Sequence, residues 1–208
     1  MLEKTQVRIV AGSLRGRKLT CVVHEGMRPT PQLVREALFS ILGNAIPGRL
    51  FYDVFAGTGV VGLEAVSRGA TSARLIEKDP RLVTDIVKYA QEFGVGDKVQ
   101  VLRADVYRWA ERWIPPGRDP VNLFLSPPFP DLSEKAEEFL ALVKCLMATA
   151  PDESVLTIQA EDGFPLDQLP EVDQWDVRKY GRNMLLILVI SREPSAPPTG
   201  EPAPPASE

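Results

Sequence analysis

The alternation of strand-like and helix-like segments through the middle of the chain is the feature that most constrains its fold. Apolar segments predict strands at 50–55, 73–76, 99–102, 121–125 and 155–159. Segments with helical spacing lie between and after them at 59–68, 80–93, 106–113 and 133–149. Such alternation predicts an α/β fold with a mainly parallel sheet and helices on both faces.

The two ends of the chain carry different patterns. Segments 177–180 and 184–190 flank a Gly-Arg-Asn turn, which predicts a terminal hairpin and one antiparallel strand in the sheet. Residues 7–12 and 17–23 flank a second turn and predict an N-terminal β-hairpin, and Thr30 is predicted to cap a helix over 30–44. The last residues are rich in Pro, Ala, Ser and Glu, which favours disorder. We therefore expect a hairpin extension at 1–28, one main domain at 29–192 and a disordered Pro-rich tail at 193–208.

Composition excludes several classes of protein. Of the 208 residues only two are cysteines, Cys21 and Cys145, and they form no CxxC pair. This argues against a disulfide framework or a zinc site and fits a cytoplasmic location. Because the two cysteines form no zinc-binding pattern, we expect no metal. The longest apolar run, 184–190, is too short to span a bilayer, so we also expect no membrane partner.

Charge is distributed unevenly along the chain. The net charge is −4, yet residues 1–35 carry seven basic side chains against two acidic ones. A basic end on an acidic body can contact phosphate groups, although a solvated surface hairpin would show the same pattern.

A glycine-rich turn follows the first strand of the predicted sheet. Gly57, Gly59 and Gly62 match GxGxxG between a strand and a helix, which is the context of a nucleotide-type site. Glu77 ends the next strand, 20 residues after Gly57, where its carboxylate can hold ribose hydroxyls, and Asp105 follows the third strand. We expect the cofactor site to comprise Asp53, Phe55, Ala56, Gly57, Thr58, Gly59, Gly62, Glu77, Lys78, Asp105, Val106 and Ser126.

Two cofactors fit these residues, a nicotinamide dinucleotide and S-adenosylmethionine. A dinucleotide places its pyrophosphate at a helix N-terminus. S-adenosylmethionine has no phosphate but carries an ammonium and a sulfonium, and Asp53 supplies a carboxylate for them. The segment LFLSPPF at 123–129 favours S-adenosylmethionine, because hydride transfer needs no platform of two prolines and an aromatic ring.

The platform suits methyl transfer to an exocyclic amine of a base. The prolines end the strand and fix the backbone so that a carbonyl points at the amine, while the Ser126 hydroxyl accepts a second hydrogen bond. A base stacked on Phe129 gains roughly 1–3 kcal/mol. We therefore expect the catalytic residues to be Ser126, Pro127, Pro128 and Phe129.

Six segments along the chain together resemble a known protein family. The segments RIVAGSLRGRKL, RPTPQLVREALFSIL, DVFAGTGVVGLEAVSRGA, IEKD, SPPF and KYG occur in this order over about residues 6–190 and resemble the RsmD-type methyltransferases. The resemblance implies a Rossmann-like class I methyltransferase fold with a seven-stranded sheet. It also implies methyl transfer from S-adenosylmethionine to N2 of a guanine in small-subunit ribosomal RNA.

The partner implied by the resemblance is small-subunit ribosomal RNA or an assembling small ribosomal subunit. We expect the protein itself to be a monomer. The basic residues of the N-terminal end are then expected to contact RNA phosphates, and they are Arg8, Arg15, Arg17, Lys18, Arg28 and Arg35.

One residue departs from the family pattern. The family usually has Asp, and sometimes Asn, where this chain has Ser126, and a hydroxyl is neutral and shorter than a carboxylate. Two other functions therefore stay open beside guanine-N2 methylation. One is a catalytically weak RNA-binding homologue, and the other is a DNA or RNA exocyclic-amine methyltransferase with another target base.

Overall fold

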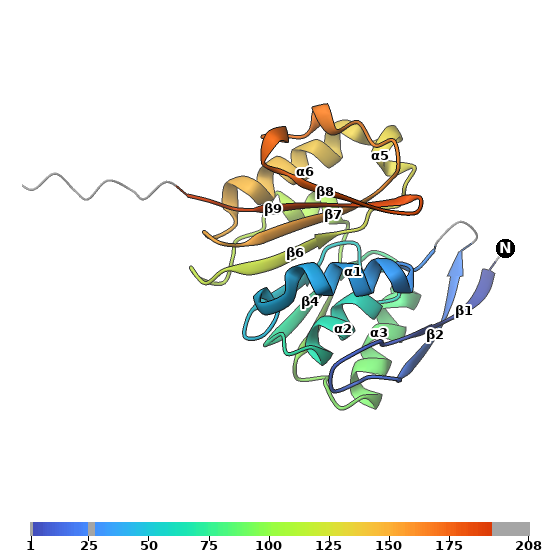
Figure 1. The fold of residues 1–208 in the computed structure, drawn as a ribbon. Helices are drawn as coiled ribbons and strands as arrows, with labels where there is room; N and C mark the ends of the chain where they lie inside the picture. Colours follow the sequence, from blue (N-terminus) through green and yellow to red (C-terminus); the bar gives the residue numbers. More distant parts are fainter. Residues whose placement is uncertain (1, 25–27, 193–208) are drawn as a thin grey trace, which may run out of the picture.

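A seven-stranded sheet forms the centre of the computed structural model, which describes residues 2–24 and 28–192 (Figure 1). The strand order is β5-β4-β3-β6-β7-β9-β8. The strands are β3 (Leu50–Asp53), β4 (Ser72–Glu77), β5 (Val99–Arg103), β6 (Val121–Leu125), β7 (Val155–Glu161), β8 (Asp176–Tyr180) and β9 (Asn183–Val189). Neighbours from β5 to β7 are parallel, whereas β9 is antiparallel to β7 and to β8. This confirms the mostly parallel sheet with one antiparallel strand. The predicted tail at 193–208 lies outside the described residues.

Helices cover both faces of the sheet, as expected. One face packs against α1 (Gln32–Leu42), α2 (Val60–Ser67) and α3 (Pro80–Glu92). The other packs against α4 (Val106–Ala110), α5 (Asp131–Glu134) and α6 (Ala136–Thr149). Successive residues of a strand point to opposite faces, so Phe51 joins the first buried cluster and Tyr52 the second. Figure 1 shows α1 to α3 on the same side as the N-terminal hairpin and α6 on the other.

Several predicted helix ends are wrong. Helix α1 begins at Gln32 without a side-chain cap, and the Thr30 hydroxyl donates to Gln159 instead. The helix expected over 133–149 is divided into α5 and α6, and Ser133 lies inside α5 with its hydroxyl on the Pro130 carbonyl. The helix expected over 106–113 ends at Ala110. By contrast, Pro80 does occupy the first turn of α3.

The N-terminal hairpin is present, but its strands are shifted. They are β1 (Leu2–Arg8) and β2 (Lys18–His24), with Arg8 paired to Lys18, rather than 7–12 and 17–23. The connection leaves the ladder because it docks on α2. The N–H of Ser13 donates to the Ser67 carbonyl over 2.8 Å, and Gly12 lies so close that a Cβ would be 1.9 Å from that oxygen. The hairpin is thus fixed to the main domain through its turn.

Arg35 does not lie on the surface, so the expectation that it contacts RNA is wrong. Its side chain is 1% exposed and pairs with Glu64 of α2 over 3.3 Å. The guanidinium also donates to the carbonyls of Thr30 and Arg8, over 2.9 and 2.7 Å. Burial lowers the pKa of Arg35 and the nearby Glu64 carboxylate opposes this shift. Arg35 therefore ties β1, α1 and α2 together and does not extend a basic surface.

Candidate active site

A pocket of about 1030 Å³ opens where β3, β4, β6 and β7 end. It brings together the turn after β3, the end of β4, the start of α4 and the segment after β6. The lining includes all predicted catalytic residues and all predicted cofactor residues except Gly59 and Gly62. The separate sequence segments therefore form one site at the carboxyl edge of the sheet, as ligand sites in open α/β sheets do.

The glycines of the turn are required by the backbone and by packing. Gly57 and Gly59 have φ angles of 53° and 74°, which favour glycine. A Cβ on Gly59 would lie 2.6 Å from Ile86 of α3, and one on Gly62 would lie 2.8 Å from Leu75 of β4. Gly59 and Gly62 thus let α2 approach its neighbours, and Gly57 turns the chain along the pocket wall.

Asp53 ends β3 and lines the pocket, although it is only 1% exposed. Its carboxylate accepts a hydrogen bond from the Gly62 N–H over 3.0 Å. Burial raises the pKa of Asp53 to about 7, partly opposed by the bond from Gly62. A cation placed beside this carboxylate would favour its ionised form, so Asp53 suits a positively charged ligand group.

Glu77 is held by backbone N–H groups on both of its oxygens. One oxygen accepts from Gly57 and the other from Asp79, each over 2.8 Å. Burial raises the pKa of Glu77, and the bonds from Asp79 and Gly57 oppose the rise. The carboxylate is thereby fixed beside the glycine-rich turn, and each oxygen keeps a lone pair for a ligand hydroxyl.

The third predicted acid, Asp105, caps α4. Its carboxylate accepts from the Arg108 N–H over 3.2 Å, and its exposed side chain lies on the pocket lining beside the buried Val106. Lys78 also lines the pocket and is exposed. Their proposed contacts with a cofactor stay predictions.

The segment after β6 provides the expected platform. Pro127 is buried, whereas Ser126 and the Phe129 ring are partly exposed on the pocket wall. The Pro128 carbonyl accepts the Asp131 N–H over 2.9 Å at the entry to α5. No hydrogen bond among the described residues occupies the Pro127 carbonyl, so this carbonyl is the better candidate for a substrate amine.

Gln159 was missed by the sequence analysis. It lies in β7, is 3% exposed, and its Oε1 accepts from the hydroxyls of Ser126 and Thr30 over 3.0 and 3.1 Å. Its Nε2 donates to Asn183 Oδ1 over 2.9 Å. The only signal in the sequence was a polar amide in a largely apolar strand, which also contains Thr157.

A second missed group lies at the edge of the pocket. The Tyr107 hydroxyl donates to Asp131 over 3.0 Å, and Lys135 pairs with the same carboxylate over 3.1 Å. Burial raises the pKa of Tyr107, and its bond to Asp131 raises it further. The Tyr107 ring meets Phe55 edge-on at 5.9 Å, so these residues give one wall an aromatic character.

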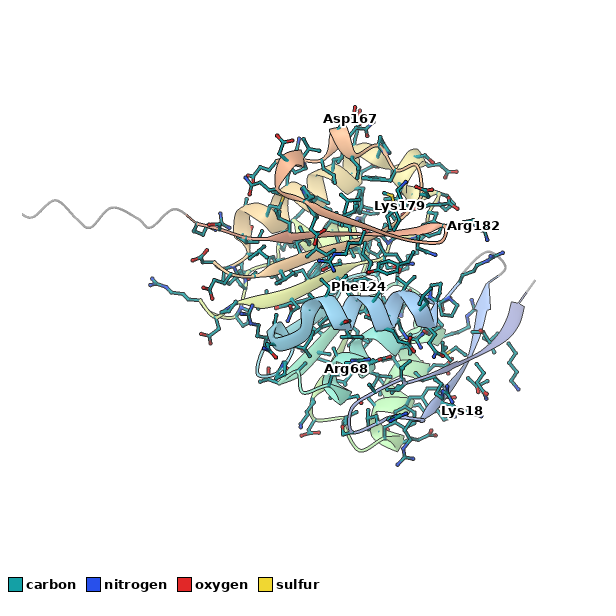
Figure 2. The ribbon with its side chains drawn as sticks, viewed as in Figure 1. Lys18, Arg68, Phe124, Asp167, Lys179 and Arg182 are labelled. Carbon is teal, nitrogen blue, oxygen red and sulfur yellow. The ribbon has the colours of Figure 1, made fainter. Side chains whose placement is uncertain are left out.

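The predicted RNA-binding residues other than Arg35 are exposed, and Arg28 lines the pocket. A shallow groove of about 440 Å³ lies between β1 and the start of α1, and Arg8 and Lys18 line it. Arg182 also lines the main pocket, at the tip of the β8–β9 turn, and was not predicted. Figure 2 shows Lys18 on the hairpin and Arg182 on that turn.

The described residues contain neither a metal-binding cluster nor a membrane-spanning helix. Within 2–24 and 28–192, no group of three or more His, Cys, Asp and Glu side chains is placed to hold a metal ion. Every helix in those ranges is too short or too polar to cross a membrane.

Comparisons with known proteins point to one family. The profile of the family described as Conserved hypothetical protein 95 matches residues 7–189. Ribosomal RNA small subunit methyltransferase D of Haemophilus influenzae is 34% identical over 78% of this chain and 83% of its own length. The protein of that name in Escherichia coli K12 is 38% identical, but the match covers only 60% of this chain and 61% of the relative.

Solved structures agree on the fold. The Escherichia coli protein yhhF superposes with a TM-score of 0.73 at 28% identity, over 91% of this chain and 100% of its own. A hypothetical protein of Thermus thermophilus gives a TM-score of 0.70 at 30% identity, over 88% and 99% of the two chains. The sheet order, the helices on both faces and the N-terminal hairpin therefore confirm the Rossmann-like class I methyltransferase fold, and this chain belongs to the ribosomal RNA small subunit methyltransferase D family.

Proposed function

We propose that this protein transfers a methyl group from S-adenosylmethionine to N2 of a guanine in small-subunit ribosomal RNA. The observation that carries the proposal is that the Ser-Pro-Pro-Phe platform and the glycine-rich turn with Glu77 line the same pocket. Family membership supports the substrate class, since relatives of this family are named for ribosomal RNA of the small subunit.

The acids of the pocket fit this cofactor. Asp53 offers a buried carboxylate to the ammonium and sulfonium charges, and Glu77 offers fixed carboxylate oxygens to the ribose hydroxyls. The wall formed by Phe55 and Tyr107 suits an adenine ring. Bound S-adenosylmethionine supplies an electrophilic methyl group, and its sulfonium becomes a thioether when the methyl leaves.

The platform prepares the amine for attack. N2 of guanine is a poor nucleophile because its lone pair is delocalised into the ring. Hydrogen bonds from its two N–H groups to Ser126 Oγ and to the Pro127 carbonyl turn the lone pair out of the ring plane, while Phe129 holds the base. Positioning of this kind can supply about 7–11 kcal/mol, so no strong base is needed before the methyl group moves. The surplus proton then leaves N2 for water.

The hairpin supplies the contacts that hold RNA. Arg8, Arg15, Arg17, Lys18 and Arg28 are exposed, and Arg8 and Lys18 line the groove beside the start of α1. These side chains pair with phosphates, which carry no sequence information. The guanine is unpaired or flipped into the pocket, because its N2 cannot be reached within a helix. We place the protein in the cytoplasm, acting as a monomer on an assembling small subunit.

Methyl transfer to ribosomal RNA tests the proposal. Purified protein is incubated with methyl-labelled S-adenosylmethionine and small subunits from a strain that lacks the gene, and the RNA is then digested to nucleosides. We expect label in N2-methylguanosine alone. Label in another nucleoside would show that the target base is a different one. RNA binding without label would show that the protein is an RNA-binding homologue without this activity. An assay with large subunits is the control and should give no label.

A further inference from the structure

Ser126 can make a hydrogen bond of either polarity with a substrate amine. A carboxylate can only accept, whereas a serine hydroxyl can accept or donate. A hydroxyl that donates towards a guanine amine would meet that amine's N–H groups and weaken the positioning. Some other group must therefore accept a hydrogen bond from the Ser126 hydroxyl if Ser126 is to act as an acceptor towards the amine.

The structure provides that group. Ser126 Oγ donates to Gln159 Oε1 over 3.0 Å, which leaves the lone pairs of Oγ for the pocket. The amide itself is fixed, because Nε2 donates to Asn183 Oδ1 over 2.9 Å and the whole side chain is 3% exposed. Its second amide lone pair receives the Thr30 hydroxyl over 3.1 Å.

The network reaches back to the hairpin. Thr30 precedes α1, and its carbonyl accepts from the buried Arg35 over 2.9 Å, which also binds the Arg8 carbonyl of β1. Gln159 is therefore held on three sides by side chains from separate elements. A buried amide that is bonded through both its oxygen and its nitrogen resists reorientation.

We propose that Gln159 is a positioning residue, whose amide oxygen accepts the hydrogen bond that the Ser126 hydroxyl donates, so that Ser126 meets the substrate amine only as an acceptor. This rests on the proposed function. It also assigns a role to the pair: Ser126 and Gln159 together do what a single acceptor-only side chain does at this place.

The test is a pair of double-mutant cycles on turnover at saturating RNA and cofactor. Gln159→Met has nearly the same volume but no acceptor, and should lower kcat about tenfold with little change in KM. In a Ser126→Ala background, Gln159→Met should add less than about a twofold loss, because no hydroxyl is left to orient. In a Ser126→Asp background it should also add little, since a carboxylate already accepts without help.

Controls separate this role from general support of the fold. Thr157→Val removes another buried polar atom from the same face of β7, one whose hydroxyl has no partner among the described residues, and should leave kcat unchanged. Gln159→Glu keeps the acceptor oxygens and should stay within about threefold of the parent. The Gln159→Glu variant tests the positioning role even if Gln159→Met does not fold. Cofactor affinity by calorimetry reports whether each variant keeps the pocket intact.

The outcomes are distinct. Equal losses from Gln159→Met in all three backgrounds, or a Gln159→Glu variant below a tenth of the parent turnover, would overturn the positioning role alone. A parent protein that labels no guanine would overturn the proposed function and this inference with it.

Discussion

The two halves of the pocket are held in different ways. On the side of β3 and β4, the acids Asp53 and Glu77 are fixed by backbone N–H groups of Gly62, Gly57 and Asp79. On the side of β6 and β7, Ser126 is fixed by a side chain, Gln159, which depends in turn on other side chains. The first half is built within the segment from β3 to the start of α3, and the second from contacts between segments up to 129 residues apart.

This difference separates the two tasks of a group-transfer site. Backbone donors cannot be exchanged by substitution, so the half that faces the cofactor keeps its geometry whatever substrate is used. Side-chain partners can be exchanged one at a time, so the half that faces the base can change its acceptor, as the hydroxyl at Ser126 illustrates. Substitutions in the two halves should therefore affect different measured quantities.

The largest effect is expected on the cofactor side. Glu77→Ala removes the ribose acceptors and leaves the N–H groups of Gly57 and Asp79 without their partner. We expect S-adenosylmethionine to bind about 100-fold more weakly by calorimetry. The reason is that a hydrogen bond to a charged group is worth ~1.5–3 kcal/mol. Glu77→Gln keeps one acceptor oxygen and should lose about tenfold. An unchanged Kd for Glu77→Ala would remove Glu77 from the cofactor site.

Phe129→Ala should affect the other half alone. Loss of base stacking is worth roughly 1–3 kcal/mol, so kcat/KM for RNA should fall by about tenfold or more. Cofactor affinity should stay within about twofold, because Phe129 follows β6, whereas the acids proposed to bind the cofactor end β3 and β4. Leu132→Ala, a nearby residue of α5 that packs on the buried cluster, is the matched control. A comparable loss of cofactor affinity would contradict the separation of the two halves.

The same division explains what the sequence could predict. Periodicity and residues close in sequence predict the strands, the glycine-rich turn and the acids at strand ends. The structure has all three at the predicted places. The Gln159 network joins segments 33 and 129 residues apart, and no local pattern encodes such a pairing. Arg35 was misread for the same reason, since its partner Glu64 lies on another helix. Thr30 was predicted to cap a helix because capping depends on residues close in sequence, but its hydroxyl donates to Gln159 of β7.

A smaller effect is expected from pH through Asp53. Its pKa in the folded protein is raised from 3.8 to about 7, so the carboxyl is partly protonated near neutrality. A cationic ligand requires the ionised form, and binding should therefore release a proton. We expect cofactor affinity to rise about tenfold from about pH 6 to about pH 8 and the rise to vanish in Asp53→Asn.

The same shift affects stability in the opposite direction. Because the folded pKa lies above the unfolded one, the native state holds a proton that the unfolded chain has released between about pH 4 and about pH 7. The contribution of Asp53 to the free energy of unfolding is therefore fully present below about pH 4 and is lost as the pH rises through about 7. Denaturant titrations of the parent and of Asp53→Asn measure it. A parent without this pH-dependent loss would place the pKa of Asp53 at an ordinary value.

The smallest effect should come from the hairpin, which belongs to neither half. Arg15→Ala and Lys18→Ala together remove two exposed charges and should weaken RNA binding only a few-fold at moderate salt. The salt dependence is the sharper readout, since each lost phosphate contact on single-stranded RNA lowers the slope of log K against log salt by about 0.7. Cofactor affinity, and methyl transfer at saturating RNA, should not change. Arg118→Ala with Lys144→Ala removes the same charge from exposed positions on loop and α6, and should leave the slope unaltered. If both pairs lowered the slope equally, RNA would be attracted by the whole surface and the hairpin would have no special place in binding.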